Sequence, residues 1–517
     1  MRSSFAILTS AALLAAASML MAAGKPGEGK LDLTITDRET GQVIPCRVHL
    51  KNPAGVPQKV LKMPFWHDHF VCPGVLNLTL RKGQYTFFIE RGPEYPERYG
   101  HFILRDFGED AHTIDLPRAA NMASENWWSG DLNVHRSVRD IELAMQADDL
   151  HVAPLIVWTN KPLNSKKPAT SEAAPTETPA SRAVEFDTDR YYEATAGEDR
   201  RAGGGVRFFH LDKPLALPEP KAATPTSIDL VLEAKQQPRA WIDADVLAPD
   251  LPLWLATGKV DSIQVIGQDF LREKMQPKAV AGKLPKQPLT DAADVGEWAQ
   301  RVYWNVLESG LRIPPTAGSG SGVSPNPLGY NRAYVWADKE RFDYDIWWES
   351  LRAGRALVTN GPLPRPHANG RPPGHQFRAS ESNELSIDVA MNLTIRDQVK
   401  YLEVIRNGQL IQSRRLEDWA KTGHFEPFTV RESGWFLVRV ATEVKDTFRF
   451  ATTGPWYVEA ADQPLRVSRK AAQFFFDCVE ERAAAVAKDA ALAVAYAPHL
   501  AAARAFWQQR LAGATAD

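Results

Sequence analysis

Residues 30–117 alternate apolar and polar side chains in short runs. "KLDLTITD" (30–37) is typical, with an apolar residue at every second position, and this period of two places one set of side chains on the buried face of a strand. The runs are separated by Pro, Gly, Asn and Lys, which favour turns. The pattern predicts a small N-terminal β-sandwich over residues 30–117.

Between residues 118 and 366, strand-like runs alternate with helical ones. The apolar run at 151–158 is typical of a buried strand, whereas residues 137–150 and 295–310 carry apolar residues three or four positions apart, as on one face of a helix. This alternation predicts an α/β domain with a parallel sheet or barrel. In such folds sites gather at the C-terminal ends of the strands, where residues 130–136 are expected.

The pattern changes again in the last quarter of the chain. Residues 380–460 return to short alternating runs, and "RNGQ" (406–409) is a hairpin signal, so a second β-sandwich is predicted there. Residues 463–511 are rich in alanine and are predicted to form a helical tail that packs back through the phenylalanines at 474–476.

Two segments differ from these patterns. Residues 1–24 combine Arg2, an alanine-rich apolar run and a small-residue end, which is typical of a cleaved signal peptide; a retained membrane anchor is the alternative that the length permits. Residues 161–183 are rich in Pro, Ser, Thr and charge and are predicted to form a flexible insertion, because they offer little apolar surface to bury. The protein is expected to be secreted or periplasmic.

Composition narrows the functions to consider. The 61 Lys and Arg residues nearly balance the 63 Asp and Glu residues, for a net charge of −2, which argues against a nucleic-acid partner. No later run is long and apolar enough to span a bilayer. The three cysteines cannot form a cysteine zinc cluster, although Cys46 and Cys72 could pair in an oxidising compartment. The 15 tryptophans indicate large packing surfaces or sugar-binding faces.

Two short motifs carry candidate metal ligands. "GDLNVHR" (130–136) offers only His135 where a metal site would use two imidazoles, because the other position is Asn133. "FWHDHF" (65–70) offers two histidines on one face of a strand, but the sequence shows no third ligand for them.

Several motifs in one order resemble a known family. "SGDLNVHR" resembles the opening motif of the PHP (polymerase and histidinol phosphatase) superfamily. "GLRIPPTAGSGSG", "NPLGYNRAYVW", "WWESLRAGRALVTNGPL" and "SGWFLVRV" extend the similarity to secreted CehA/McbA-type metallohydrolases. The resemblance implies a PHP-like distorted (β/α)7 barrel at 118–366, flanked by the two β-sandwich modules and followed by the helical tail. It also implies two or three divalent metals and hydrolysis of phosphoester, ester or carbamate bonds by a metal-bound hydroxide.

Carried over position by position, the family's metal ligands are mostly missing. The opening His-x-His pair falls on Asn133 and His135, and a family glutamate corresponds to Glu198. The histidine after that glutamate is absent, with His210 close by in sequence. The late Gly-Ser-Asp-x-His motif falls on residues 318–322, where its aspartate and histidine are both glycine. The resemblance therefore implies a vestigial site with His135 and Glu198 as the remaining ligands, for Zn, Mn or Mg if the protein is active.

Other chemistry is open at the same strand ends. Asp131 lies within the opening motif, and Asp243 alternates with Asp245 on one strand, which suits a hard oxygen site for Mg²⁺ or Ca²⁺ unless these carboxylates simply face water. Ser319 and Ser321 are candidate nucleophiles, but no histidine is placed by sequence to activate either. The glycine run around them suits either an anion-binding nest or a tight connection.

Two functions follow from these patterns. One is a secreted PHP-type metallohydrolase homologue with a vestigial metal site, in which family membership is better supported than hydrolysis. The alternative is a non-catalytic secreted protein that binds a small molecule, a glycan, a cell-envelope component or a protein partner, without a cofactor. Two β-modules and many tryptophans suit the second function.

Overall fold

The computed structural model describes residues 27–160, 183–219, 221–277, 289–338, 340, 342–379, 384–460 and 463–517. The predicted signal peptide at 1–24 and nearly all of the predicted insertion at 161–183 lie outside these residues. The chain divides into two compact units. The N-terminal unit comprises residues 1–119 with 146–148, and the main unit comprises 120–145 with 149–517.

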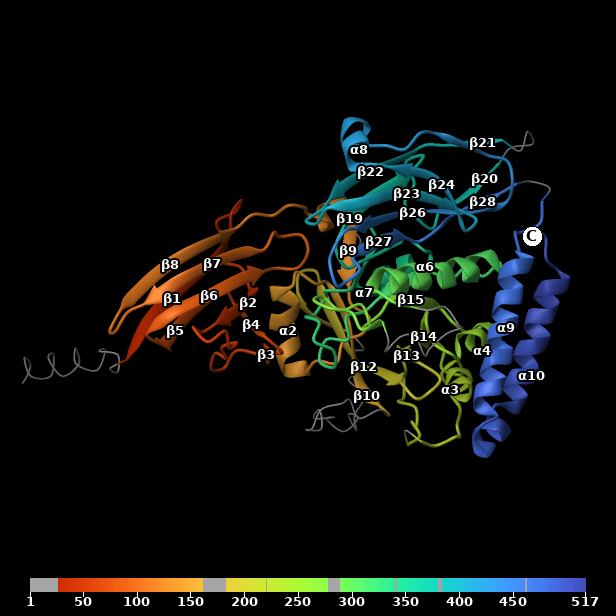
Figure 1. Cartoon of the computed structure of the whole chain (residues 1–517), viewed down its shortest axis with the longest axis horizontal. Coiled ribbons are helices and arrows are strands. Elements are labelled where there is room, and N and C mark those ends of the chain that lie inside the picture. Colours follow the sequence, from red (N-terminus) through yellow and green to blue (C-terminus); the bar gives the residue numbers. More distant parts are fainter. Residues whose placement is uncertain are drawn as a thin grey trace, which may run out of the picture. The chain divides into compact units, whose positions relative to one another are not determined.

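The N-terminal unit is built from two sheets of short strands (Figure 1), with the orders β5-β1-β8 and β3-β4-β2-β6-β7. In β1 the predicted alternation is present, because Leu31, Leu33 and Ile35 are buried and share one core with Val48 of the other sheet. The strands are β1 Glu28–Asp37, β2 Cys46–Lys51, β3 Phe65–Trp66, β4 His69–Cys72, β5 Val75–Arg81, β6 Gly83–Glu90, β7 Arg98–Leu104 and β8 Glu109–Leu116.

One large sheet runs through the main unit, in the order β16-β15-β14-β13-β12-β10-β9-β17-β18-β27-β26-β23-β24. Strand β11 pairs with β12, β28 pairs with β26, and β20 pairs with β28. The strands are β9 Trp127–Gly130, β10 Val152–Thr159, β11 Val184–Asp187, β12 Arg190–Asp199, β13 Val206–Phe209, β14 Trp241–Asp245, β15 Ser262–Ile266, β16 Pro315–Ala317, β17 Arg332–Trp336, β18 Ala356–Thr359, β20 Gln376–Arg378, β23 Val399–Arg406, β24 Gln409–Arg414, β26 Gly434–Thr442, β27 Phe450–Thr453 and β28 Trp456–Glu459.

Two further pairs complete the C-terminal part of the main unit. Strands β19 Leu363–Ala368 and β22 Val389–Thr394 form one pair, and β21 Leu385–Ile387 and β25 Phe428–Val430 form the other. Their buried side chains, among them Val389 and Val430, share a core with Phe436 and Trp456 of the large sheet.

The large sheet shows that the expected (β/α)7 barrel is wrong. Within the described residues it is a mixed sheet of 16 strands that does not close, and strands hold 37% of the residues against 23% in helices. The chain turns directly from β12 into the antiparallel β13, whereas a barrel of β/α units needs a helical crossover between parallel strands. Through the β18–β27 pair, the C-terminal strands continue this sheet, and β19, β21, β22 and β25 pack against them.

The helices agree more closely with the sequence pattern. The segments predicted as helical at 137–150 and 295–310 coincide with α2 Val138–Ala147 and with most of α6 Ala292–Glu308, and both predictions are confirmed. The other helices are η1 Ala123–Glu125, α3 Ser227–Ala234, α4 Leu251–Ala256, α7 Tyr344–Arg352, α8 Leu416–Thr422, α9 Arg469–Val486 and α10 Ala490–Ala512.

The predicted helical tail consists of α9 and α10, which run side by side (Figure 1). Phe475 stacks on the buried Trp507 with ring centroids 4.7 Å apart, and the Trp507 indole donates to the carbonyl of Pro252 at 3.0 Å. The tail therefore packs on the rest of the main unit through its aromatic residues, as its sequence predicted.

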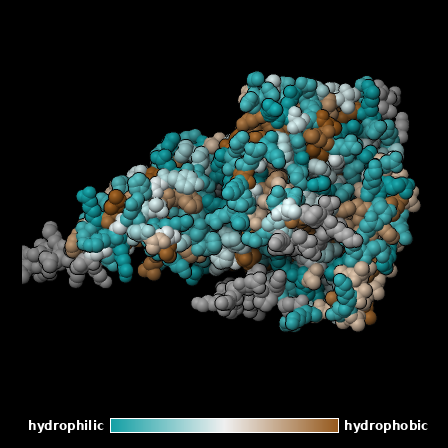
Figure 2. Space-filling model, in the orientation of Figure 1, coloured by the Kyte–Doolittle hydropathy of each residue, from teal (hydrophilic) through white to brown (hydrophobic). Residues whose placement is uncertain are grey.

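The described helices show no membrane-spanning candidate, since none is long and apolar enough to cross a bilayer. The face of the molecule in Figure 2 is mostly hydrophilic, with small apolar areas scattered over it.

Candidate functional site

The motif at 130–136 continues from the end of β9 and lies beside the glycine-rich loop at 317–322. The Leu132 amide donates to the carbonyl of Ala317 at 3.0 Å, and the His135 amide donates to the carbonyl of Ser321 at 2.8 Å. Two segments that the sequence separates by almost 200 residues are thus hydrogen-bonded neighbours, and they carry most of the predicted site residues.

Asp131 fastens these two segments together. Its carboxylate is fully buried; one oxygen accepts from the amides of Asn133 at 3.0 Å and Ser319 at 2.9 Å, and the other accepts from the amide of Gly329 at 2.8 Å. Burial raises the pKa of Asp131 to about 6 despite these donors. Its partners are backbone amides, so its role here is to hold the loop.

The shifted pKa of Asp131 predicts a pH-dependent stability. The folded state binds the Asp131 proton more tightly than the unfolded chain, whose aspartate pKa is about 3.9. The free energy of unfolding should therefore fall as pH rises from about 4 to 6, by up to about 3 kcal/mol. Asp131→Asn should lose this slope, so the wild-type minus variant difference, measured by urea unfolding, should decline with rising pH. A difference that rises with pH would contradict the assignment.

His135 and Glu198, the two residues that the resemblance to the PHP family implies as ligands, lie close together. His135 Nε2 is 2.9 Å from Asn133 Oδ1 and 3.4 Å from Glu198 Oε2. Burial works to raise the pKa of Glu198, but Arg200, His135 and Arg207 hold it well below its usual range. Glu198 is therefore a carboxylate at neutral pH. The Asn133 amide oxygen faces the imidazole nitrogen that would otherwise be free for a metal.

Arg207 occupies the centre of the cluster. Its guanidinium is fully buried and contacts three carboxylates: Glu198 Oε1 at 3.1 Å, Asp243 Oδ2 at 2.9 Å and Asp245 Oδ1 at 2.5 Å. Burial works to lower the pKa of Arg207, and the Asp245, Asp243 and Glu198 carboxylates raise it. The guanidinium is permanently charged, so it supplies these carboxylates with the positive charge that a metal ion would otherwise bring.

The remaining oxygen of Asp243 is engaged as well. Asp243 Oδ1 accepts from the hydroxyls of Ser262 at 2.7 Å and Thr316 at 2.5 Å. Gln264 joins the two halves of the cluster, because its amide donates to Asp243 Oδ2 at 3.2 Å and accepts from Asn133 at 3.4 Å. Asp243 and Asp245, which were considered as ligands for Mg²⁺ or Ca²⁺, therefore both accept from Arg207, and Asp243 also accepts from two hydroxyls.

These residues do not fit the divalent metals of the PHP family. A multinuclear site needs imidazoles and carboxylates with free lone pairs, whereas here a guanidinium binds the carboxylates and His135 is the one imidazole among the described residues of the cluster.

Gly320 and Gly322, which stand where the PHP motif has an aspartate and a histidine, are required by the backbone conformation. Gly320 and Gly322 have φ angles of +65° and +102°, where a side chain is strained. A Cβ on Gly320 would lie 2.6 Å from Gln268 Cβ, and one on Gly322 would lie 2.0 Å from the carbonyl oxygen of His135. An aspartate at 320 or a histidine at 322 would therefore not fit this loop conformation.

The other candidate residues have structural partners or lie elsewhere. Ser319 Oγ accepts from the Asn331 amide at 3.0 Å and donates to the Asn331 carbonyl at 3.2 Å. Ser321 Oγ is buried and makes no hydrogen bond with the described residues. His210 is apart from the cluster, since its ring pairs with Glu193 at 2.7 Å and packs edge-on against Trp348. No described contact gives either serine a histidine base.

Sequence reasoning missed Arg207, the residue that organises the cluster. One signal was present: "VRFF" places an arginine within an apolar strand, and a charge on a buried strand requires a partner. Which partners it finds depends on β12 and β14, which flank β13 in the sheet.

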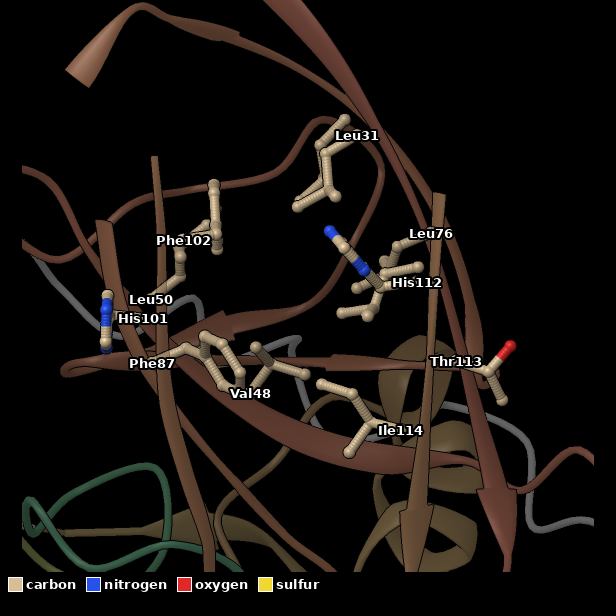
Figure 3. A pocket seen from close by; sticks show the side chains of 12 residues that line it. Leu31, Val48, Leu50, Leu76, Phe87, His101, Phe102, His112, Thr113 and Ile114 are labelled. Carbon is tan, nitrogen blue, oxygen red and sulfur yellow. The ribbon is translucent and has the colours of Figure 1, made fainter. Parts of the chain in front are cut away.

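The N-terminal unit contains a second candidate site, a cavity of about 230 Å³ between its two sheets. Figure 3 shows side chains from both sheets pointing into it. The lining is almost entirely apolar and includes Leu31, Leu33, Val48, Leu50, Leu76, Leu78, Phe87, Phe102 and Ile114. The exposed His101 and His112, on the edge strands β7 and β8, also line the cavity, so it reaches the surface there.

Comparisons with known proteins give only weak likenesses. No protein-family model and no curated protein matches the chain. The group B streptococcus pilus 2b backbone protein is 16% identical over 18% of this chain and 43% of its own, with a TM-score of 0.15. The Bacillus anthracis TIE protein is 20% identical over 22% of this chain and 20% of its own, also with a TM-score of 0.15. The matches span less than half of either structure, and they define neither the fold nor the function of this chain.

Proposed function

We propose that this protein is a non-hydrolytic relative of the PHP metallohydrolases, which acts by binding a ligand. The observation that carries the proposal is the position of the Arg207 guanidinium, which contacts Glu198, Asp243 and Asp245 at 2.5–3.1 Å. PHP-type hydrolysis uses metal ions to generate hydroxide near neutral pH. Arginine cannot do this, because it offers no Lewis-acidic orbital to water and no proton that leaves near neutral pH.

The ligand site proposed for this binding function is the cavity of the N-terminal unit. An apolar cavity of about 150 Å³ can hold benzene, so the 230 Å³ between these sheets suits a chain of about nine carbons. The apolar lining selects hydrocarbon, and the histidines at the mouth can contact a polar head group. We propose a short acyl or alkyl chain, such as that of a cell-envelope component, as the occupant.

The absence of hydrolysis is tested with the purified full chain. We expect no hydrolysis of bis(4-nitrophenyl) phosphate or 4-nitrophenyl acetate that depends on added Zn²⁺, Mn²⁺ or Mg²⁺. Glu198→Gln is compared with the exposed Glu426→Gln as a matched control. A metal-dependent rate that Glu198→Gln abolishes and Glu426→Gln retains would show that the protein is a hydrolase after all.

The binding site is tested with a series of linear alcohols from butanol to decanol, measured by calorimetry. Affinity should rise by several-fold per added methylene, since each buried CH₂ contributes about 0.8 kcal/mol, and should stop rising when the cavity is full. Leu33→Phe or Leu78→Phe should fill part of the cavity and weaken octanol binding at least tenfold, while leaving the unit as stable as the wild type or more so.

Leu61→Phe is the control for these substitutions, because Leu61 belongs to the same unit and is 86% exposed. It should bind octanol like the wild type. Equal binding by all four proteins would place the alcohol outside the cavity and overturn the proposed site.

A further inference from the structure

Three potential metal ligands meet in the sheet of the N-terminal unit that contains β2 and β4. The antiparallel register of these strands pairs Val48 with Phe70, and its next step sets His49 opposite His69. Asp68 lies in the two-residue turn between β3 and β4. The other turn residue, His67, has a φ of +49°, as two-residue hairpin turns require.

The Asp68 carboxylate bridges the two imidazoles. Its Oδ2 is 3.0 Å from His49 Nδ1, and its Oδ1 is 3.0 Å from His69 Nδ1. The three donor atoms lie within 4.8 Å of one another. Zinc binds nitrogen and oxygen at about 2.0–2.2 Å, so neighbouring ligands of one tetrahedral ion lie about 3.3 Å apart. A small movement would let all three atoms bind one ion.

The proton balance of His49 also points to a cation. Its Nδ1 faces Asp68, and its Nε2 faces Glu90 Oε1 at 2.9 Å. A neutral imidazole has one donor and one acceptor nitrogen, so a neutral His49 can satisfy only one of these carboxylates. The ring itself is fully buried. A cation bound between Nδ1 and Asp68 satisfies both carboxylates and leaves Nε2–H donated to Glu90.

Glu90 is positioned to support such a ligand. Its other oxygen is 3.0 Å from Arg47, which also pairs with Asp148 of the same unit. A carboxylate that accepts from the outer nitrogen of a ligating histidine is the common supporting arrangement at zinc sites, where it orients the ring and fixes its tautomer. The carboxylates outnumber the guanidinium in this group, so it has negative charge to offer a cation.

We propose that His49, Asp68 and His69 form a binding site for a divalent transition-metal ion, Zn²⁺ in the first instance. Two imidazoles and one carboxylate match the ligands that zinc prefers and leave a fourth position for water or another ligand. Metal binding uses the neutral form of each imidazole. Both rings coordinate through Nδ1, so each neutral imidazole keeps its single proton at Nε2 and no net proton is released.

The site is tested with untagged full-length protein, freed of metal by a chelator and titrated with Zn²⁺ by calorimetry and with Co²⁺ by absorption spectroscopy. We expect one ion per chain and visible Co²⁺ bands typical of tetrahedral coordination. His69→Gln and Asp68→Asn should each weaken zinc binding at least 100-fold. Glu90→Gln should weaken it by 10–100-fold, as for other outer residues of zinc sites.

Two controls make the assignment specific. His67→Asn changes the exposed histidine of the same turn to a residue that also tolerates positive φ, and it should bind zinc like the wild type. Glu198→Gln, in the main unit, should do the same. Stoichiometric binding that survives His69→Gln, or that Glu198→Gln or His67→Asn removes, would overturn the proposal, as would the absence of binding by the wild type.

Discussion

Arg207→Ala should destabilise the main unit by about 3–5 kcal/mol, because removing one partner of a buried ion pair leaves uncompensated charge. Here the substitution leaves Glu198, Asp243 and Asp245 without the guanidinium that they share. Of these carboxylates, Glu198 and Asp243 are fully buried. Few other single substitutions in this chain would strand so many charges together.

The effect can be measured by urea unfolding followed through tryptophan fluorescence, since all the tryptophans except Trp66 belong to the main unit. Arg239→Ala is the matched control, because Arg239 is half exposed and pairs with the exposed Asp345. Such surface pairs contribute about 0–1 kcal/mol. Comparable losses in the two variants would show that Arg207 does not organise the cluster.

The loss should also depend on pH. Without Arg207, which lowers the folded-state pKa values of Glu198 and Asp243, those values rise, so the folded variant holds protons more tightly than the folded wild type does. The free energy of unfolding of Arg207→Ala, relative to wild type, should therefore fall as pH rises and recover on acidification. A loss that is constant from pH 5 to 8 would indicate a packing defect instead.

Gly322→Ala should be the second strongly destabilising change, at about 3 kcal/mol or more, as the sum of two effects. The φ of +102° is unfavourable for any residue with a Cβ, at roughly 1–2 kcal/mol. The new Cβ would also lie 2.0 Å from the carbonyl oxygen of His135, and relieving such a contact costs roughly 1–3 kcal/mol more.

Gly258→Ala separates these two effects. Gly258 has a φ of +65° but nothing within 4 Å of its would-be Cβ, so it should lose only the conformational part, roughly 1–2 kcal/mol. Urea unfolding of both variants measures the free energy of unfolding. If Gly322→Ala lowers it no more than Gly258→Ala does, the loop accommodates the new Cβ without further cost. If the larger loss is found, Gly322→His cannot rebuild the family's ligand in this loop.

Local features of the structure could be read from the sequence. The period of apolar residues predicted α2, α6 and the helical tail, and it predicted the buried alternation of β1, because burial on one face of an element depends on residues a few positions apart. The sequence likewise shows Asn133, Gly320 and Gly322 at positions where the PHP motifs have metal ligands.

The contacts that the buried charged residues make depend on the tertiary structure. Arg207 lies opposite Glu198 in the β12–β13 pair and opposite Asp243 in the β13–β14 pair. The pairing of β2 with β4 brings His49 next to His69 and Asp68. The open sheet, too, depends on which strands pair. Strand pairing brings together residues that are distant along the chain, and its register sets which side chains share a face. Apolar periodicity within one segment predicts α2, α6, the helical tail and the alternation of β1, whereas the partners of each buried charge follow from how the strands pair.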